Sequence, residues 1–402
     1  MSESLDRSDT VNRVYLVACF AHTIQLGIKE GLKQSKKLHD TIGRCRDLVK
    51  KITDSPKLLE AFQAVCSYLK VNFKVPDLDV ETRWNSTWTM VDSVLSLRKP
   101  LMELLRRIRD RHDGYCTFSI EPRSPLACAI PEESWLAMTD FCKFLAPFKD
   151  ATDLMSGSTY PTLGLAVPVF YVIQQHVTKS IQEAESAFNS PHHTTIFARA
   201  VQSKLNDYEV KIRRKEALMA AALDPRIKMC MQKVGVSKNE LRTMVNHEFT
   251  VYYFLKYKKF EQRSTSIANK DNSHASNSYN SNKRGKLLDS LMGLLDSADG
   301  EDENNGHGDE EPFANELERW LSHAGMKIDQ SSRDVCMWFK VNSHLFPRIG
   351  FMARDFLGIT STSVPSECAF SKSGTTISKR RARLGDDAVT AIQELQAFLN
   401  FK

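Results

Sequence analysis

The feature that most constrains this chain is a long succession of segments whose apolar residues recur every three or four positions. This spacing puts apolar side chains on one face of a helix, so each segment predicts an amphipathic α-helix. Prolines and stretches rich in glycine or serine separate the segments. The predicted helices cover residues 21–32, 38–52, 57–69, 87–108, 135–154, 163–181, 196–210, 215–223, 238–260, 313–321, 333–342, 345–356 and 387–398. The sequence therefore predicts a mainly α-helical protein.

Two local features refine this pattern. Residues 14–20 (VYLVACF) are a short apolar run rich in β-formers, which predicts a buried strand directly before the first helix. Within residues 87–108, Pro100 is expected to kink the helix or divide it in two, because proline lacks the N–H that a helix interior needs.

Composition excludes several classes of protein. Of the 402 residues, 42% are hydrophobic and 26% charged, which is too apolar for a wholly disordered chain. No apolar run approaches the ~18–20 residues of a membrane span, so we expect no membrane partner. Nine cysteines without a Cys-x-x-Cys pair argue against a disulfide framework or a four-cysteine zinc site.

Residues 262–282 are rich in Ser and Asn, and residues 300–311 are acidic, so both stretches predict disorder. Between them, residues 286–296 (KLLDSLMGLLD) are too apolar for a plain linker. This segment is either a short helix that docks on a partner or on its own domain, or a transient helix in a loop.

Four segments together carry a functional signal, although each is weak alone. They are residues 18–26 (ACFAHTIQL), 81–88 (ETRWNSTW), 222–228 (ALDPRIK) and 338–402, which contains ARDFL, TSVPSECAFS and KRRARL. In this order they resemble the hAT superfamily of transposases, the group that also gave rise to domesticated BED-finger proteins. The resemblance covers nearly the whole chain except the Ser/Asn-rich insert. Its most specific part is the C-terminal block, which resembles the family's dimerisation region.

The resemblance implies an RNase H-like core interrupted by a large all-helical insertion. We therefore expect a mainly α fold with a partial RNase H-like α/β core. The expected division is residues 1–97 for the N-terminal part of this core, 98–261 for the helical insertion, 262–312 for a disordered linker, and 313–402 for the last core segment and the dimerisation region.

The resemblance also implies a catalytic remnant. The family cuts DNA with three carboxylates, because two hard cations ~3.5–4 Å apart must activate water and stabilise the leaving oxygen. The third acid maps onto Glu367, and the arginine that follows it in the family is Cys368 here. The first two acids and a BED finger precede the Cys-x-x-His segment in the family, and only 18 residues precede Cys19. We therefore expect no resident cofactor, and Mg²⁺ or Mn²⁺ only where a longer chain completes the site.

Other positions follow from the same resemblance. Cys19 and His22 match the Cys-x-x-His pair that lies near the family's active site; the alternative is a small buried thiol and a core histidine. Arg83 and Trp84 match an Arg-Trp pair whose indole stacks on an unpaired base; the alternative is an aromatic packed at the start of a helix.

The C-terminal block carries two further sets of candidates. A basic cluster predicts phosphate contacts or a nuclear-import signal, or else a solvated loop; it comprises Lys379, Arg380, Arg381 and Arg383. An apolar face larger than one helix buries alone predicts a core or a subunit interface, and the resemblance favours the interface. Its residues are Trp338, Phe339, Leu345, Phe346, Phe356 and Leu357.

These observations predict a transposase-derived, non-catalytic protein that dimerises through its C-terminal region and acts in the nucleus on DNA or chromatin. Two alternatives stay open. One is a truncated fragment of an active hAT transposase, which performs metal-dependent DNA cleavage and strand transfer. The other is a protein-interaction module without DNA binding.

Overall fold

The computed structural model describes residues 17–80, 83–118, 124–127, 130–186, 192–271, 312–326 and 335–364, with single residues at 387, 391, 394 and 395. These ranges consist mainly of helices and contain no strand. The first half contains α1 (Phe20–Gln34), α2 (Lys36–Thr53), α3 (Pro56–Tyr68), α4 (Trp84–Ser96), α5 (Arg98–Arg109), α6 (Glu132–Met155), η1 (Leu163–Leu165), α7 (Ala166–Ser186) and α8 (His192–Ile212). The second half contains α9 (Lys215–Leu223), η2 (Lys228–Val234), α10 (Lys238–Glu248), the π-helical turn η3 (Phe249–Tyr253), α11 (Phe254–Asp271), α13 (Phe313–Ser322), α14 (Val335–Asn342) and α15 (Pro347–Leu357).

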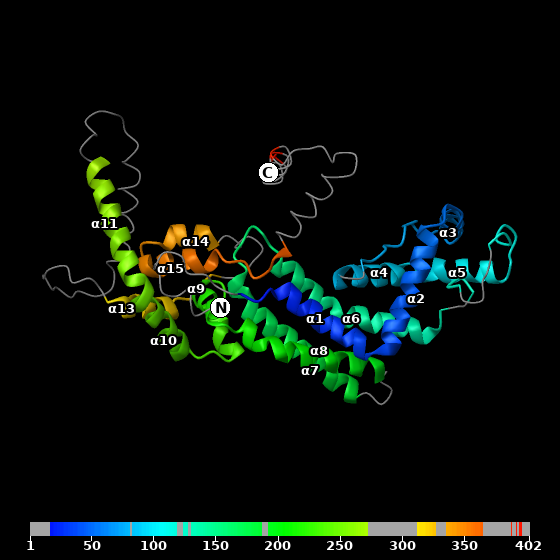
Figure 1. Ribbon diagram of the computed structural model, residues 1–402, viewed down its shortest axis with the longest axis horizontal. Helices are drawn as coiled ribbons and strands as arrows, with labels where there is room; N and C mark the ends of the chain where they lie inside the picture. The colour runs from blue at the N-terminus through cyan, green and yellow to red at the C-terminus, as the bar shows by residue number, and fades with distance from the viewer. Residues whose placement is uncertain are drawn as a thin grey trace.

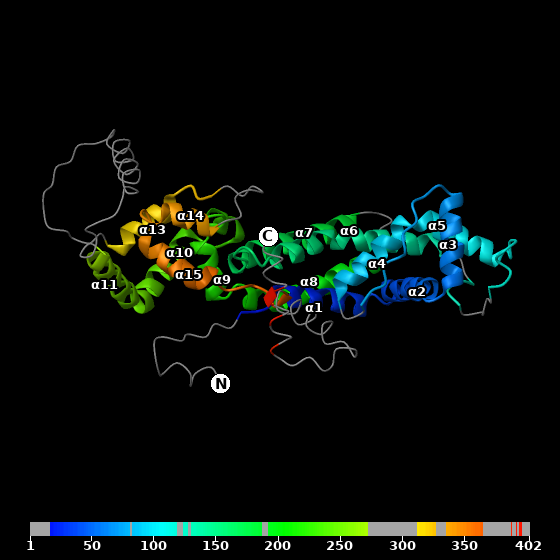
Figure 2. The same cartoon turned by 90° about the horizontal axis from the view of Figure 1, so that it is seen from above.

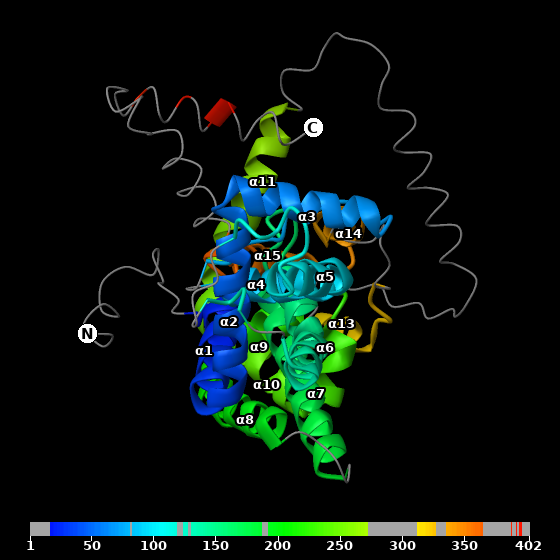
Figure 3. The ribbon, with the colours of Figure 1, turned by 90° about the vertical axis from the view of Figure 1, so that its right-hand side faces the viewer.

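The helices form an elongated body with α2–α5 at one end and α10, α11 and α13–α15 at the other (Figure 1). Between these ends, α1, α6, α7 and α8 lie side by side, as the view from above (Figure 2) and the view from the end (Figure 3) both show. One hydrophobic core extends through the body from Phe20 in α1 to Leu357 in α15. None of the described helices has both the length and the hydropathy needed to cross a membrane.

The contact between α1 and α8 is the most extensive helix pair in the described part of the chain. Two glycines of α1, four residues apart, face α8. A Cβ atom on Gly31 would lie 2.7 Å from side-chain atoms of Phe197 and Val201, and one on Gly27 would lie 3.3 Å from Leu205. Because neither glycine carries a side chain, α1 and α8 approach each other closely along this stretch.

The predicted helices that fall in the described ranges are confirmed, with shifts of a few residues at most of their ends. The start of α3 illustrates why: Ser55 is its N-cap and accepts from the backbone N–H of Leu58, and Pro56 occupies the first helical position. The proline there loses no hydrogen bond, so the Asp-Ser-Pro sequence sets the boundary. The helix predicted over residues 238–260 instead continues to Asp271 and contains the π-helical turn η3.

Two predictions are wrong in detail. Phe20, assigned to a strand over residues 14–20, begins α1, and residues 17–19 are irregular; residues 14–16 lie outside the described ranges. A short apolar run does not distinguish a strand from the start of a buried helix. The helix predicted over residues 87–108 does divide, but at Leu97 rather than Pro100, which sits in the first turn of α5 where a missing N–H is tolerated.

The domain division stays a prediction, and the hydrophobic core is continuous across its boundary at residue 97. The boundary falls between α4 and α5, and both helices contribute to the same core, including Val94 and Leu101. At the other boundary, α11 continues to Asp271, past residue 261. The predicted linker over residues 262–312 otherwise lies outside the described residues, apart from residue 312, and so does most of the predicted helix over residues 387–398. The expected α/β core has no strand in the described ranges, so it stays a prediction.

The glycines of α1 and α2 give a matched test of helix contact. Gly31→Ala would force a methyl group into Phe197 and Val201, and we expect it to lower the free energy of unfolding by roughly 1–3 kcal/mol. Gly43 in α2 has open space around it, so Gly43→Ala is expected to be neutral or to stabilise by ~0.5–1 kcal/mol through helix propensity. Chemical denaturation of both variants measures the difference, and equal effects would contradict the close α1–α8 contact.

Candidate functional site

Two of the four motif segments meet at the N-terminus of α1. The backbone N–H of Phe20 donates to the carbonyl oxygen of Ser361 at 2.9 Å. The Sγ of Cys19, the N-cap residue of α1, lies 3.5 Å from the Oγ1 of Thr362 and 3.6 Å from the Oγ of Ser363. The start of α1 is therefore fixed to residues 361–363, and the last two of these begin the motif TSVPSECAFS. We call this contact the α1 junction.

A buried ion pair from the third motif holds the α1 junction from the other side. The guanidinium of Arg226 contacts both carboxylate oxygens of Asp224, with Nη2 at 2.6 Å from Oδ2 and Nε at 3.0 Å from Oδ1. The same Nη2 donates to the carbonyl of Pro161 at 2.9 Å. The Oγ1 of the next residue, Thr162, accepts from the backbone N–H of Ser361 at 3.1 Å. The ion pair therefore positions residues 161–162, which in turn hold residue 361.

The α1 junction changes the acidity of the Cys19 thiol. Burial raises the pKa of Cys19, but hydrogen bonds from the Thr362 side chain and from the backbone of Ser363 and His22 outweigh burial, so the pKa lies below its ordinary value. For comparison, burial raises the pKa of Cys142 to about 12. Because the thiolate is the nucleophilic form, Cys19 is expected to react faster than a buried core thiol.

Cys19 is the N-cap residue of α1, and His22 lies in the first turn of that helix with its side chain exposed to solvent. Within the described ranges, no group of three or more His, Cys, Asp or Glu side chains is arranged to hold a metal ion. The pair therefore finds no third ligand in that part of the chain.

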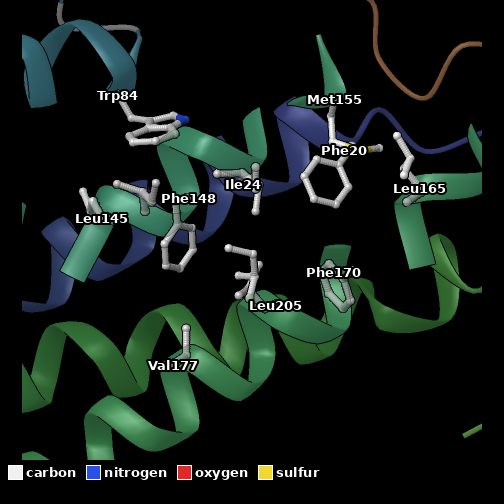
Figure 4. Close-up of a cluster of buried hydrophobic side chains, with 14 of the residues drawn as sticks. Phe20, Ile24, Trp84, Leu145, Phe148, Met155, Leu165, Phe170, Val177 and Leu205 are labelled. Atoms are coloured by element: carbon white, nitrogen blue, oxygen red, sulfur yellow. The ribbon is translucent and has the colours of Figure 1, made fainter. Parts of the chain in front are cut away.

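The second motif contacts the same helix, α1, from the start of α4. The backbone N–H of Trp84, the first residue of α4, donates to the Oε1 of Gln25 in α1 at 3.0 Å. The indole of Trp84 is only 5% exposed and lies in the apolar core near Leu145 and Phe148 (Figure 4). Its faces are covered by protein, so the fold supports core packing rather than the predicted stacking on a base. Arg83, in contrast, is exposed to solvent.

An ion pair orients the segment that leads into this motif. Arg46 of α2 contacts both carboxylate oxygens of Asp79, and the Oγ1 of Thr87 donates to the same carboxylate at 2.9 Å. Burial raises the pKa of Asp79, but these hydrogen bonds outweigh burial and keep the pKa below its ordinary range. The irregular chain between α3 and α4 is thereby fastened to both α2 and α4.

The third motif also fixes the C-terminal helices. The indole N–H of Trp320 in α13 donates to the carbonyl of Ala222 at 2.8 Å. The ammonium of Lys228 donates to the carbonyls of Trp320 and His323, the latter at 2.8 Å, and lies 4.1 Å from the centre of the Trp320 ring. Burial lowers the pKa of Lys228 to about 8. Asp224 also ends α9 as its C-cap residue.

The predicted dimer face divides between the inside and the outside of the protomer. Phe346, Phe356 and Leu357 are buried in the core, so including them in an interface was wrong. Phe346 packs edge-to-face on Trp320, with ring centres 5.2 Å apart. Trp338 and Phe339 are partly buried against the same tryptophan, and Leu345 is exposed. A sequence pattern identifies an apolar helix but not which of its faces the neighbouring helix covers.

The remaining candidates lie outside the described residues. They are Glu367 and the basic cluster of Lys379, Arg380, Arg381 and Arg383. Only two residues separate Glu367 from Val364, whose backbone N–H donates to Thr362 at the α1 junction.

Two family models match regions of the chain that carry these motifs. Residues 17–119 match the family model described as the ZBED1 RNase-like helical domain, and residues 316–399 match the hAT family C-terminal dimerisation region. The chain is 26% identical over 381 residues to the putative AC transposase of Zea mays, covering 94% of this chain and 43% of that protein. This chain is a hAT transposase-like protein.

Other relatives of this hAT-like chain carry zinc finger names. It is 23% identical over 372 residues to the zinc finger BED domain-containing protein RICESLEEPER 3 of Oryza sativa subsp. japonica, covering 91% of this chain and 44% of that protein. It is 25% identical over 333 residues to the zinc finger BED domain-containing protein DAYSLEEPER of Arabidopsis thaliana, covering 79% of this chain and 40% of that protein. The chain thus spans less than half the length of these relatives.

The site of the hAT-like chain includes residues that sequence reasoning missed. Thr362 and Ser363 contact Cys19 from 343 and 344 positions away, and the Asp224–Arg226 pair holds the α1 junction in place. The motifs that contain these residues were recognised, but no local pattern assigns their partners. The one sequence signal for the ion pair was an acidic residue, Asp224, two positions before Arg226 and directly after the helix predicted over residues 215–223.

The acidity of Cys19 gives a pH-dependent test. Thr362→Val removes a hydrogen bond that favours the thiolate, so we expect the pKa of Cys19 to rise and its alkylation near pH 8 to slow several-fold. Mass spectrometry of the peptide that contains Cys19, after timed exposure to iodoacetamide across a pH series, measures this change. Cys142 in the same sample is the internal control and should stay unmodified while the protein is folded. An unchanged pH profile for Cys19 would contradict the contact.

Proposed function

We propose that this hAT-like chain belongs to a transposase-derived protein that self-associates through its C-terminal region and acts in the nucleus on DNA or chromatin without cutting it. The match of residues 316–399 to the dimerisation region supports self-association. The similarity to a transposase and to BED zinc finger proteins supports a role on DNA.

The observation that carries this proposal is an apolar stripe on the outer face of α14. Met337 and Val341 are one helical turn apart, and Leu345 follows in the turn after the helix. Their side chains are 53%, 63% and 42% exposed, whereas the opposite side of α14 packs on α13 through Trp338 and Phe339. Scattered apolar residues are common on a surface, but three in register inside this region suit an isologous contact between two copies.

The dimer is tested by placing a charge in this stripe. Val341→Glu would bury an unpaired carboxylate between two copies, so we expect the dimer dissociation constant to rise at least about tenfold, or ~1.4 kcal/mol. Sedimentation velocity over a concentration series measures it. Val210→Glu is the matched control, because Val210 is 80% exposed on α8, outside the dimerisation match. A monomeric parent protein, or an unchanged dimer in Val341→Glu, would contradict the proposed interface.

The non-catalytic part of the proposal rests on the residue beside the remnant acid. In this chain Cys368 stands where the family motif carries arginine, so a cation next to Glu367 is absent from that position. A neighbouring cation stabilises both a carboxylate and the charge that develops on a phosphate. Its replacement by a thiol supports a binding role over a cutting role.

DNA action is tested with one substrate and two readouts. We expect the protein to bind duplex DNA with an affinity that falls steeply as salt rises, because phosphate contacts release counterions. We also expect no nicking in Mg²⁺ or Mn²⁺, and no effect of Glu367→Gln on binding. Nicking that Glu367→Gln abolishes would favour an active transposase fragment. No binding at low salt would favour a protein-interaction module.

A further inference from the structure

The strongest feature that the proposed function does not use is an apolar surface on the helix formed by α10, η3 and α11. Its outward-facing residues are Val251, Tyr252, Phe254 and Leu255, which we call the α11 stripe. Val251 is 55% and Leu255 71% exposed, and their spacing of four places them on one side. The opposite side, with Tyr253 and Tyr257, is buried.

A hollow continues this surface along α10. It has a volume of about 590 Å³ and is lined by Asn239, Glu240, Thr243, Met244, His247 and Lys215. Met244, His247 and Val251 follow one another at helical spacing, so the hollow and the α11 stripe share one side of the helix. Lys215 connects the two, since its ammonium lies 5.8 Å from the ring centre of Tyr252. A stripe with an adjoining hollow is the shape that accepts an amphipathic helix.

The path of the chain brings one candidate segment to this surface. The described part of α11 ends at Asp271, and the chain resumes at residue 312, before α13. Phe313 stacks on Phe249 of the π-helical turn, with ring centres 3.9 Å apart. The chain therefore leaves the far end of α11 and returns to Phe249, just before the start of that helix. A tether anchored at both ends of one helix keeps any apolar segment within it at roughly millimolar effective concentration near that helix.

The intervening sequence contains a segment of matching chemistry. Residues 286–296 (KLLDSLMGLLD) place Leu287, Leu291, Leu294 and Leu295 at helical spacing. From residue 286 to 311 the chain carries nine acidic residues and one lysine, whereas residues 254–263 of α11 carry three lysines, one arginine and one glutamate. The acidic residues that follow the segment are thus opposite in charge to α11, which favours pairing of the two apolar surfaces.

We propose that residues 286–296 dock as an amphipathic helix on the α11 stripe and its hollow, within the same chain. The segment then covers the apolar side chains of α11, and its acidic flank lies along the lysines of that helix. This contact is separate from the α14 stripe and from any contact with DNA.

Hydrogen exchange of the purified full chain tests this proposal. We expect the amides of residues 286–296 to exchange at least about tenfold more slowly than an unstructured chain, at every protein concentration. Val251→Glu with Leu255→Glu should bring exchange there to the unstructured rate, and so should Leu291→Glu with Leu295→Glu. Combining all four changes should add nothing further, because both pairs remove one contact.

Two controls keep the result specific. Val172→Glu, at a residue of α7 that is 60% exposed, should leave the protection of residues 286–296 unchanged. Val341→Glu should also leave it unchanged, so failure of the proposed dimer is separable from failure of this contact. Absence of protection in the parent protein overturns the proposal. Protection that appears only at high concentration overturns it in favour of a second copy, and protection that survives Val251→Glu with Leu255→Glu overturns the docking surface.

Discussion

The buried pair of Arg226 and Asp224 is the interaction on which the arrangement of the motifs depends. The guanidinium satisfies a carboxylate that is fully buried and holds the carbonyl of Pro161. Thr162 then receives the N–H of Ser361, whose carbonyl receives the N–H of Phe20 at the start of α1. A buried pair of this kind adds little net stability, but removing one partner leaves an uncompensated charge and costs roughly 3–5 kcal/mol. The ion pair thereby fixes how residues 161–162, Ser361 and the start of α1 are placed relative to one another.

Close helix contact extends this placement along the molecule. Gly27 and Gly31 let α1 lie against α8, and Gln25 of the same helix receives the backbone of Trp84. This one helix therefore begins within the first motif and contacts two of the other three, the second and the fourth. At the far end, the indole of Trp320 attaches α13 to α9, and Lys228 attaches it to the chain that follows α9. Motif segments that are far apart in the sequence thus contact one another in the fold.

Much of the fold followed from sequence because its signals are local. Helical periodicity depends on residues within one or two turns, and the helices predicted from it are confirmed in the described ranges. The strand at residues 14–20 and the break at Pro100 were misplaced because a short apolar run fits either element and the first turn of a helix accepts proline. The site was harder to predict, since Thr362 meets Cys19 only through tertiary contact.

The sequence by itself determined that this chain is mainly helical, where its described helices begin to within a few residues, and which motifs make it hAT-like. Helix formation depends on residues that are neighbours in the sequence, and the resemblance depends on the order of the motifs. Only the tertiary structure decided which apolar residues are available to a partner. Trp84, Phe346 and Phe356 are covered, while Val341 and Leu255 face solvent. Periodicity is the same for both sets, and the difference arises because a helix buries only the face that another element happens to cover.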